Sequence, residues 1–371
     1  MSAPFPFPLV TIEGDARARG RQYGRLAAAR IETSLRIYMA AWAAGEAPAR
    51  AALLDRARAF VPVIGDRFPE LLDEMRGIAE GAERPFEEIV ALNARTELLY
   101  GEPPADGCTG AVILPELAGG RVVIGQNWDW RPACRDSAIV LRVVPDRGPS
   151  LLTFVEAGML ARSGMNSAGI GLCGNFLHSD MDHRQRGVPI PVIRRAILMS
   201  PTLPTAVGEV LRAPRAFSSN HLLAHRDGEA IDLEASPPEV FPLFAEDGLL
   251  VHSNHFKAAA GRVRDTGLVR YPDSLFRDRR VRKHLTGCAR PLGVSHLQEA
   301  LRDHFGLPDS VCRHCAPRPD GTEIETVASV VMDLTEGELW LCPGPVCEHE
   351  YRRFSLHAET AAPAPAAGRA T

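Results

Sequence analysis

The sequence predicts an α+β fold in which stacked β-sheets are covered by helices. Apolar residues recur at helical spacing through the region before residue 100, and short β-rich segments dominate the centre of the chain. Helical segments also fall between the groups of strands. This order favours sheets covered by helices.

The region before residue 100 is predicted to be helical. Between Tyr23 and Trp42, apolar side chains three and four positions apart define one buried face. Three further helical patterns follow, at residues 53–60, 71–78 and 86–92. We therefore expect an N-terminal helical segment ahead of the first strands.

The centre of the chain is predicted to contain the sheets. Two β-rich runs, 111–114 and 121–124, flank a loop that contains Pro and Gly, which is typical of a hairpin. Further strands are expected at 138–144, 151–156, 170–173, 220–225, 230–234, 249–252 and 327–334, and helices at 189–198, 202–212 and 274–285. The last helix carries Arg277, Arg279, Arg280 and Arg282. We expect them on a solvated face, with a coenzyme A phosphate as the alternative partner.

The composition excludes several classes of function. With 45% hydrophobic and 24% charged residues, the 371-residue chain is predicted to be a soluble globular protein. Its formal net charge of −4, without a long basic run, disfavours nucleic acid and membrane as partners. The start lacks the pattern of a signal peptide, and the eight cysteines are scattered. We expect a cytoplasmic, reduced protein.

Gly107 and Cys108 carry the strongest chemical signal. Gly107 has no Cβ, so the backbone can adopt strained dihedrals and its carbonyl is open to attack by the neighbouring thiol. Such an attack would form a thioester, and water would then release Cys108 as a new N-terminus. The pKa of an α-amine is about 7.7–8.0 and that of a thiol about 8.5, so a proton passes between the two groups at little cost in free energy. One residue would then supply both nucleophile and base.

The hairpin is expected to bring an acidic residue to the thiol. If the loop turns near Leu117 and Ala118, antiparallel pairing sets Cys108 opposite roughly Asn127. Asp129 would then lie beside the thiol although it is distant in sequence.

Two motifs in this hairpin resemble a known family. Residues 106–109 (Asp-Gly-Cys-Thr) and 125–129 (Gly-Gln-Asn-Trp-Asp) resemble the acyl-coenzyme A:6-aminopenicillanic acid (isopenicillin N) acyltransferase family, the C45 peptidases, which are self-cleaving N-terminal-nucleophile (Ntn) hydrolases. The resemblance extends from about residue 13 to residue 351. It implies a four-layer αββα sandwich, cleavage between Gly107 and Cys108, Cys108 as nucleophile, and Asp129 as a supporting residue that orients the Cys108 amine or its surroundings.

The resemblance also implies how the chain is divided. Residues 1–107 would be the α subunit after self-cleavage, and residues 108–357 the catalytic β subunit. The cleaved N-terminal fragment would remain a partner of the catalytic part. The tail at 358–371, dominated by Ala and Pro, is expected to be disordered.

Further site residues are expected beyond the hairpin. In the resembling family, the Asn of the Ser-Asn-His-Phe motif at 253–256 donates its amide to the oxyanion, which here implies Asn254; the alternative is a cap of the strand end. Arg95, Asn127 and Asn166 are candidates for site support. Arg95 precedes the cleavage site and could hold a carboxylate or carbonyl there. Asn166 belongs to a segment that either lines the pocket or forms a β-turn. The histidines His221, His252 and His255 are interpreted as structural hydrogen-bonding residues.

The acyl donor and acceptor stay open at this stage. The substrate is expected to be a small acyl-amide or acyl-thioester, acyl-coenzyme A among them, and the acyl group could pass to water or to an amine. No cofactor and no metal ligand are predicted. Two alternatives remain, a cysteine protease with a Cys–His pair and no self-cleavage, and a non-enzymatic scaffold stabilised by zinc. The zinc ligands of that scaffold would be Cys312, Cys315, Cys342 and Cys347.

Overall fold

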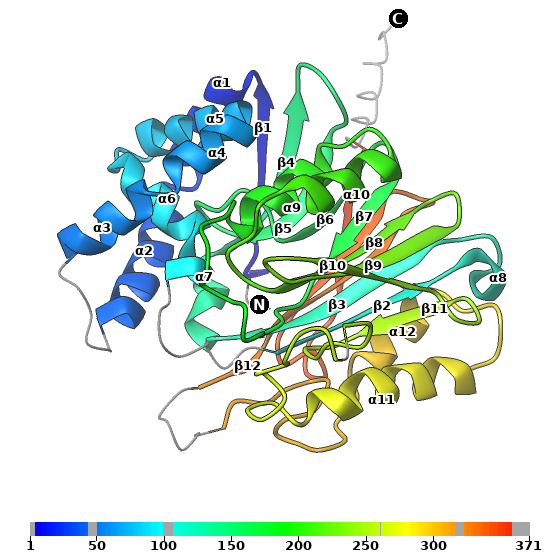
Figure 1. Cartoon of the computed structure of the whole chain (residues 1–371). Coiled ribbons are helices and arrows are strands. Elements are labelled where there is room, and N and C mark those ends of the chain that lie inside the picture. Colours follow the sequence, from blue (N-terminus) through cyan, green and yellow to red (C-terminus); the bar gives the residue numbers. More distant parts are fainter. Residues whose placement is uncertain (1–3, 44–49, 99–106, 260, 317–322, 358–371) are drawn as a thin grey trace, which may run out of the picture.

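The computed structural model describes residues 4–43, 50–98, 107–259, 261–316 and 323–357 (Figure 1). Asp106 of the Asp-Gly-Cys-Thr motif and the tail at 358–371 lie outside these ranges. Among the helices in these ranges, none has the length and apolar character needed to cross a bilayer.

Across the described residues the strands form two sheets, and the predicted α+β class is confirmed. The eight-stranded sheet contains, in spatial order, β1 (Leu9–Gly14), β4 (Ala138–Pro145), β5 (Leu151–Glu156), β6 (Ser163–Asn166), β7 (Ile170–Cys173), β8 (Ser219–His225), β9 (Glu229–Ala235) and β10 (Val240–Phe244). The six-stranded sheet contains β11 (Leu249–His252), β2 (Gly107–Ile113), β3 (Val123–Trp130), β12 (Glu325–Asp333), β13 (Glu338–Pro343) and β14 (Arg352–Ser355). Neighbouring strands are antiparallel, except that β1 runs parallel to β4.

Helices are concentrated at the N-terminus, as predicted. The first group comprises α1 (Ala16–Leu26), α2 (Ala28–Ala43), α3 (Arg50–Arg58), α4 (Val61–Arg67), α5 (Pro69–Gly81), α6 (Phe86–Asn93) and α7 (Arg95–Leu98). The later helices are α8 (Pro115–Ala118), the 3-10 helix η1 (Pro132–Asp136), α9 (Ile190–Leu198), α10 (Leu203–Arg212), α11 (Ser274–Gly287) and α12 (Val294–Ala300). The face expected between Tyr23 and Trp42 is shared by two helices, because the backbone leaves helical geometry at Ala27 (φ −110°).

The two sheets pack face to face and carry helices on their outer faces. Strand β3 contacts β7 and β2 contacts β8, which joins the sheets. Helices α9 and α10 lie on β6, β7 and β8, whereas α11 and α12 lie on β2, β11 and β12. Figure 1 shows α11 and α12 in yellow on the side away from the blue N-terminal helices. The chain is therefore layered as helices, sheet, sheet, helices.

The N-terminal segment contributes a strand as well as helices. Strand β1 was not predicted, and it forms the edge of the eight-stranded sheet next to β4. Helix α1 packs closely on α5, where a Cβ at Gly20 would lie only 2.1 Å from the carbonyl oxygen of Glu74. This segment is thus built into the sheet formed by later residues.

The register of the central hairpin differs from the prediction by one residue. Cys108 pairs with Trp128, not with Asn127, and Gly107 pairs with Asp129. The reversal uses α8 and Gly119 (φ +60°), which the loop prediction did not include. Because side chains alternate between the faces of a strand, a shift of one residue moves Asp129 to the face opposite the Cys108 thiol. The prediction that Asp129 lies beside the thiol is therefore wrong.

Candidate active site

Cys108 lies at the second position of β2, and its side chain is completely buried between the two sheets. An arginine that directly precedes β6 reaches it, with Nη2 of Arg162 3.7 Å from Cys108 Sγ. The same guanidinium lies 4.0 Å from the ring centroid of Trp128, the cross-strand partner of Cys108. A cation beside a sulfur stabilises the thiolate, which is the nucleophilic form of cysteine.

The backbone nitrogen of Cys108 is held by Asn254. The N–H of Cys108 donates to Asn254 Oδ1 at 2.8 Å, and Arg277 Nη2 donates to the same oxygen at 2.8 Å. Asn254 Nδ2 donates to the carbonyl oxygen of Phe176 at 2.9 Å. These partners fix the orientation of the amide, because both groups that face Oδ1 can only donate. Asn254 is therefore in direct contact with the proposed nucleophile through its oxygen.

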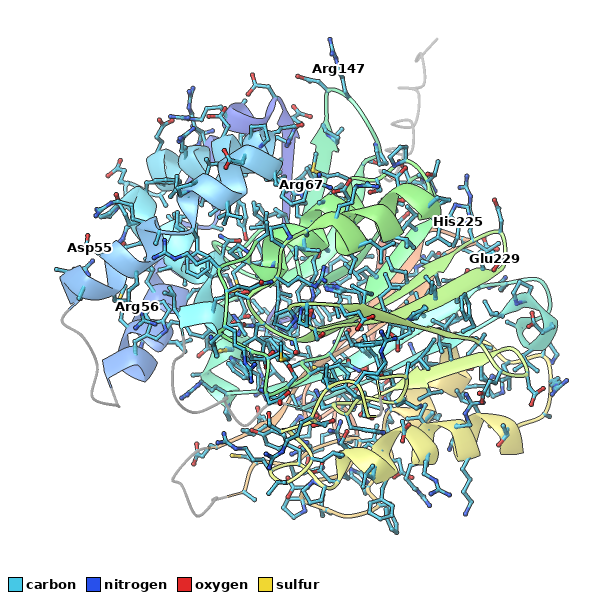
Figure 2. The ribbon with its side chains drawn as sticks, viewed as in Figure 1. Asp55, Arg56, Arg67, Arg147, His225 and Glu229 are labelled. Atoms are coloured by element: carbon cyan, nitrogen blue, oxygen red, sulfur yellow. The ribbon has the colours of Figure 1, made fainter. Side chains whose placement is uncertain are left out.

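Arg277 holds the other side of the Cys108 peptide. Its Nη1 donates to the carbonyl oxygen of Cys108 at 2.7 Å and to Thr109 Oγ1 at 2.8 Å. Asp55, Arg147 and Glu229 show the usual position of charged side chains, at the periphery of the molecule (Figure 2). Arg277, by contrast, is 1% exposed. The prediction that this arginine lies on a solvated face of its helix is wrong, because it faces the sheet together with the next apolar turns of α11.

Asp129 lies beside Gly107 on the opposite face of the hairpin. Its Oδ1 accepts a hydrogen bond from Thr326 Oγ1 at 2.6 Å, and its Oδ2 is 3.2 Å from Arg313 Nε. A Cβ at Gly107 would lie 2.6 Å from Asp129 Oδ2 and 2.9 Å from Arg313 Nε. Burial raises the pKa of Asp129, although Arg313 and Arg277 act in the opposite direction. Glycine is thus the residue that fits at position 107.

A second carboxylate connects the two buried arginines. Asp273 accepts a hydrogen bond from Arg277 Nε at 2.8 Å and also pairs with Arg313. Burial opposes ionisation of Asp273, but the two guanidinium groups outweigh it and lower the pKa of this carboxyl. An ionised Asp273 therefore links the arginine that holds Cys108 to the arginine that holds Asp129.

The three candidates for site support make other contacts. Asn127 Nδ2 donates to the carbonyl oxygens of Leu301 and Val311, each at 2.8 Å. Asn166 Nδ2 donates to the carbonyl oxygens of Leu198 and Ser200, each at 2.9 Å. These bonds anchor loops to the sheets.

Arg95 belongs to a different buried cluster. Its Nη2 is 2.9 Å from Glu156 Oε2, and its guanidinium lies 5.0 Å from the ring centroid of Trp130. The structure thus brings Asn254 to Cys108 and Asp129 to Gly107, and it places Arg95 at Glu156.

The three histidines interpreted as structural each contact a polar neighbour. His221 Nε2 is 3.0 Å from Ser219 Oγ. His252 Nε2 is 2.9 Å from Glu234 Oε1, and His255 Nδ1 is 2.8 Å from Ser274 Oγ. Ser274 also accepts the N–H of Asn254 at 2.8 Å, so His255 contributes to the support of the Asn254 loop.

Sequence reasoning missed three arginines of this site. Arg277 had a usable signal, because it lies four residues before Val281 and therefore on the same helix face. Arg313 follows Cys312, which was considered from sequence only as a possible zinc ligand of the scaffold alternative. Arg162 had no signal, since only the stacking of the two sheets brings it to Cys108.

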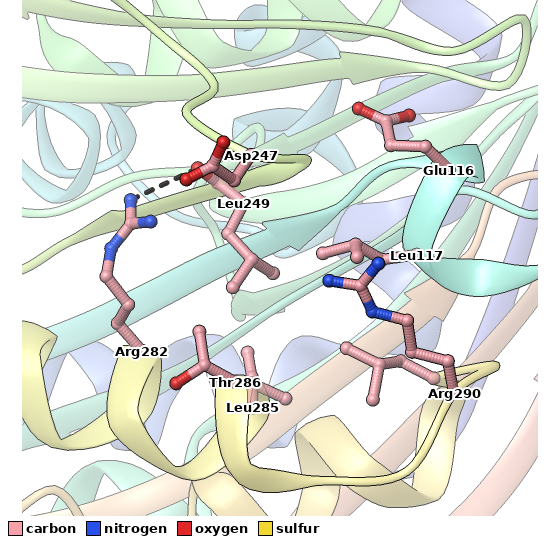
Figure 3. Close-up of a pocket in the computed structure, with 9 residues that line it drawn as sticks. Glu116, Leu117, Asp247, Leu249, Arg282, Leu285, Thr286 and Arg290 are labelled. Carbon is pink, nitrogen blue, oxygen red and sulfur yellow. Dashed lines mark hydrogen bonds between the residues drawn. The ribbon is translucent and has the colours of Figure 1, made fainter.

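A surface pocket of about 390 Å³ lies away from Cys108, between α8, α11 and the start of β11 (Figure 3). Its charged lining residues are Arg282, Arg290, Glu116 and Asp247. In β11, Leu249 pairs with Ile113, which is at the far end of β2 from Cys108. Because carboxylates share the lining with the arginines, this pocket does not favour the phosphate groups of coenzyme A.

Sequence comparison defines the protein as an enzyme of the acyltransferase class. A family model described as acyl-coenzyme A:6-aminopenicillanic acid acyl-transferase matches residues 117–345, a range that begins after Cys108. The 40 kDa form of acyl-coenzyme A:6-aminopenicillanic-acid-acyltransferase from Emericella nidulans is 32% identical over 277 residues, which are 73% of this chain and 74% of that protein. The chain belongs to the acyl-coenzyme A:6-aminopenicillanic acid acyltransferase family, and the resemblance seen in the motifs is confirmed.

Two solved hydrolase structures are similar to the chain at low sequence identity. A variant of conjugated bile acid hydrolase from Clostridium perfringens is 13% identical with a TM-score of 0.45, covering 67% of this chain and 92% of that chain. Penicillin V acylase from Agrobacterium tumefaciens is 13% identical with a TM-score of 0.40, covering 64% of this chain and 83% of that chain.

Proposed function

We propose that the protein cleaves its own chain between Gly107 and Cys108 and then uses Cys108 to transfer acyl groups. One observation carries this proposal. Both atoms that an N-terminal cysteine would use have polar partners, with Asn254 2.8 Å from the backbone nitrogen and Arg162 3.7 Å from the sulfur. The contacts that an amine and a thiolate need are therefore present in the uncut chain.

Self-cleavage would proceed in two steps. The sulfur of Cys108 attacks the carbonyl carbon of Gly107, the C–N bond breaks, and the thiol proton passes to the nitrogen, which leaves a thioester and an amine. Water then attacks the thioester carbonyl, so that Gly107 ends as a carboxylate and the sulfur is released as a thiol. The ion pair of Asp129 and Arg313 borders Gly107 at the contact distances given above and would hold this peptide in place during both steps.

Turnover would use the amine made by that cleavage. The α-amine of Cys108 takes the proton of its own thiol, and the thiolate attacks the acyl carbonyl of the substrate. The leaving amine or thiol departs with that proton, and an acyl-cysteine remains. Attack by an acceptor amine completes acyl transfer, whereas attack by water completes hydrolysis.

Asn254 has two roles in this scheme. Its Oδ1 accepts a hydrogen bond from the nitrogen of Cys108 and would orient the amine. Its Nδ2 carries two hydrogens, of which the carbonyl of Phe176 accepts one, and we assign the other to the oxyanion. Asp129 is assigned a positioning role through Arg313, on the face away from the sulfur.

The relative's name suggests the substrates. The Emericella nidulans protein is named for acyl-coenzyme A and 6-aminopenicillanic acid. We propose that this chain takes an acyl-coenzyme A or acyl-amide as donor, and that an amine related to 6-aminopenicillanic acid competes with water as acceptor. An amine wins over water when the pocket positions its nitrogen against the acyl carbonyl.

The division of the chain follows from the same proposal. Residues 1–107 would form the α subunit and residues 108–357 the catalytic β subunit of a four-layer αββα sandwich of the Ntn type. The layering of helices and two stacked sheets, with Cys108 at the start of a central strand, supports this assignment.

Intact-mass analysis of the purified protein tests the proposal. We expect two co-purifying fragments, 1–107 and 108–371, and a single chain for the Cys108→Ala variant. Assays with acyl-amide and acyl-coenzyme A donors, with and without an amine acceptor, then measure transfer against hydrolysis. Cys173→Ala is the matched control, because Cys173 is a second buried thiol between the sheets and should be dispensable for both steps.

Other outcomes would contradict the proposal. A full-length chain that is active without cleavage, and whose activity is blocked by thiol reagents, would support the cysteine protease alternative. A full-length chain that binds zinc and has no activity towards these donors would support the non-enzymatic scaffold.

A further inference from the structure

Four potential metal ligands from three separate segments meet on the outer side of the six-stranded sheet. His304 follows α12, Cys312 and His314 precede β12, and Cys347 follows β13. Their ligand atoms all lie within 4.8 Å of one another. Residues separated by more than 40 positions in sequence therefore converge on one point.

The distances within this cluster are close to those of a tetrahedral metal site. His314 Nε2 is 3.2 Å from His304 Nε2, 3.3 Å from Cys347 Sγ and 4.0 Å from Cys312 Sγ. Zinc bonds of about 2.0–2.1 Å to nitrogen and about 2.3 Å to sulfur place tetrahedral ligands about 3.3–3.8 Å apart. A single imidazole nitrogen has either one hydrogen or one lone pair, so it cannot satisfy three such neighbours by hydrogen bonding. A shared cation satisfies all of them.

We propose that His304, Cys312, His314 and Cys347 bind one structural zinc ion. Two thiolates and two imidazoles form a Cys₂His₂ set, which is typical of structural zinc, and four protein ligands leave no position open for substrate. Cys312 is buried while His304 is exposed, so the ion has a route from solvent. A carboxylate also lies near the other nitrogen of one imidazole, with Glu348 Oε1 3.9 Å from His314 Nδ1, which is longer than a hydrogen bond.

This ligand set differs from the four cysteines considered from sequence. Cys315 is exposed. Cys342 is buried, and its Sγ contacts the carbonyl oxygens of Pro343 and His349, each at 3.4 Å. Neither belongs to the group of converging ligand atoms. The sequence spacing of the cysteines favoured two Cys pairs as ligands. In the structure, His304 and His314 take the places expected for Cys315 and Cys342.

The proposed zinc site is connected to the active site through Arg313. This arginine lies between two ligands, Cys312 and His314, and its Nε is 3.2 Å from Asp129 Oδ2. The backbone N–H of Arg313 also donates to Thr326 Oγ1 at 2.8 Å, and the same hydroxyl donates to Asp129. Ligands on both sides of Arg313 would fix the backbone that aims it at Asp129 and thereby at Gly107. The zinc ion would therefore hold Arg313 in position and would take no part in the reaction itself.

Metal analysis of the purified protein tests this proposal directly. We expect one zinc per chain in the wild type and in Cys315→Ser, and at least a tenfold lower content in His304→Ala and in Cys347→Ser. Cys315→Ser is the matched control, because it removes a thiol from the same segment without removing a ligand. Replacing zinc with Co²⁺ should give a thiolate charge-transfer band and tetrahedral d–d bands in the wild type and in Cys315→Ser, and weaker charge transfer in Cys347→Ser.

A second measurement uses the wild-type protein, so it does not depend on whether the variants fold. A chelator should lower the Tm of the wild-type protein, and added Zn²⁺ should restore it. The proposal is overturned by a wild-type protein that takes up no zinc when supplied with it, or by loss of zinc from Cys315→Ser but not from His304→Ala. A disulfide between Cys312 and Cys347 in peptide maps of unreduced protein would also overturn it. Each of these readouts is independent of self-cleavage and of acyl transfer.

Discussion

Arg313 Nε lies 3.2 Å from Asp129 Oδ2, and these two atoms border the space that a side chain at position 107 would need. Both side chains are buried, at 1% and 0% exposure. The thiol of Cys108 projects from the opposite face of the same strand. The peptide between Gly107 and Cys108 is therefore enclosed by an ion pair on one face and by the sulfur of Cys108 on the other.

A methyl group at position 107 should disturb this arrangement. In Gly107→Ala, the new Cβ would approach Asp129 Oδ2 to 2.6 Å and Arg313 Nε to 2.9 Å, so the ion pair must move. We expect self-cleavage to slow by at least about tenfold and the protein to lose about 1–3 kcal/mol of stability. The fraction of cleaved chain over time, measured on denaturing gels, reports the first effect. Gly287→Ala is the control, because a Cβ there meets nothing within 4 Å and should leave cleavage unchanged.

Removing the charge of Asp129 should separate a positioning role from a structural one. Asp129→Asn keeps an acceptor for Thr326 but loses the ion pair with Arg313. We expect slower self-cleavage and a kcat reduced by up to about 10²-fold with little change in KM, since a small displacement of reacting groups has an effect of that size. The pH profile of kcat should keep its shape, because Asp129 is not the base in this mechanism. Lower thermal stability with normal cleavage and kcat would assign Asp129 a structural role alone.

Arg277 should not be replaceable by lysine. The guanidinium bonds to the Cys108 carbonyl, Thr109, Asn254 and Asp273 at once, and an ammonium group cannot reproduce that geometry. Losing two or three of these bonds should cost about 2–3 kcal/mol of stability, and kcat should fall at least about tenfold.

Urea unfolding and steady-state kinetics measure the two effects of the Arg277→Lys substitution. Arg282→Lys on the same helix is the matched control, because Arg282 is partly exposed and, among the described residues, bonds to backbone oxygens and to Glu246 and not to the site. Equal behaviour of the two variants would contradict the assignment of Arg277 to the site.

The stability of the fold should decrease as Glu97 ionises. Burial raises the pKa of Glu97 from 4.5 to about 7, and its Oε2 has no hydrogen-bond partner among the described residues. The folded state therefore holds this proton more tightly than the unfolded state. The resulting stabilisation is fully present below the unfolded pKa and is lost as pH rises through about 7, a change of about 3 kcal/mol.

Glu97→Gln should remove most of this pH dependence. Urea unfolding between about pH 5 and about pH 8, in a Cys108→Ala background that keeps the chain uncut, measures it. The chain that retains Glu97 should lose more stability over this range than the Glu97→Gln variant, while the substitution of an exposed carboxylate, Glu229→Gln, should leave the pH dependence unchanged. Parallel curves with and without the Glu97→Gln substitution would contradict the prediction.

Much of the fold was predictable because its buried segments have strong local patterns. Strands such as β4 and β12 are rich in β-branched residues, and the N-terminal helices show clear helical periodicity. The strands β1, β6, β10, β13 and β14 were not predicted. Exposed residues interrupt the patterns of β1, β10 and β14, so these strands do not stand out from loops. Strand β6 has only four residues and includes a glycine.

The site was predictable only where it is local in sequence. Cys108 and Gly107 are adjacent, and Asn254 follows a recognisable strand, so motifs were sufficient to propose these residues as candidates. The side on which Asp129 lies depends on a register set by the conformation of residues 115–120, which composition does not determine. Arg162 reaches Cys108 only through packing between the sheets, and a single sequence carries no record of such a contact.

The parallel pairing of β1 with β4 has a consequence for producing the enzyme. If residues 108–371 are synthesised alone, β4 becomes the outermost strand, and its row of amide and carbonyl groups is left open to other molecules. An unpaired edge strand of this kind can pair with strands of other molecules and so promotes aggregation. A recombinant fragment of residues 108–371 should therefore precipitate unless the N-terminal segment is supplied with it. That segment protects the edge of β4 permanently and is needed after cleavage as well as before it.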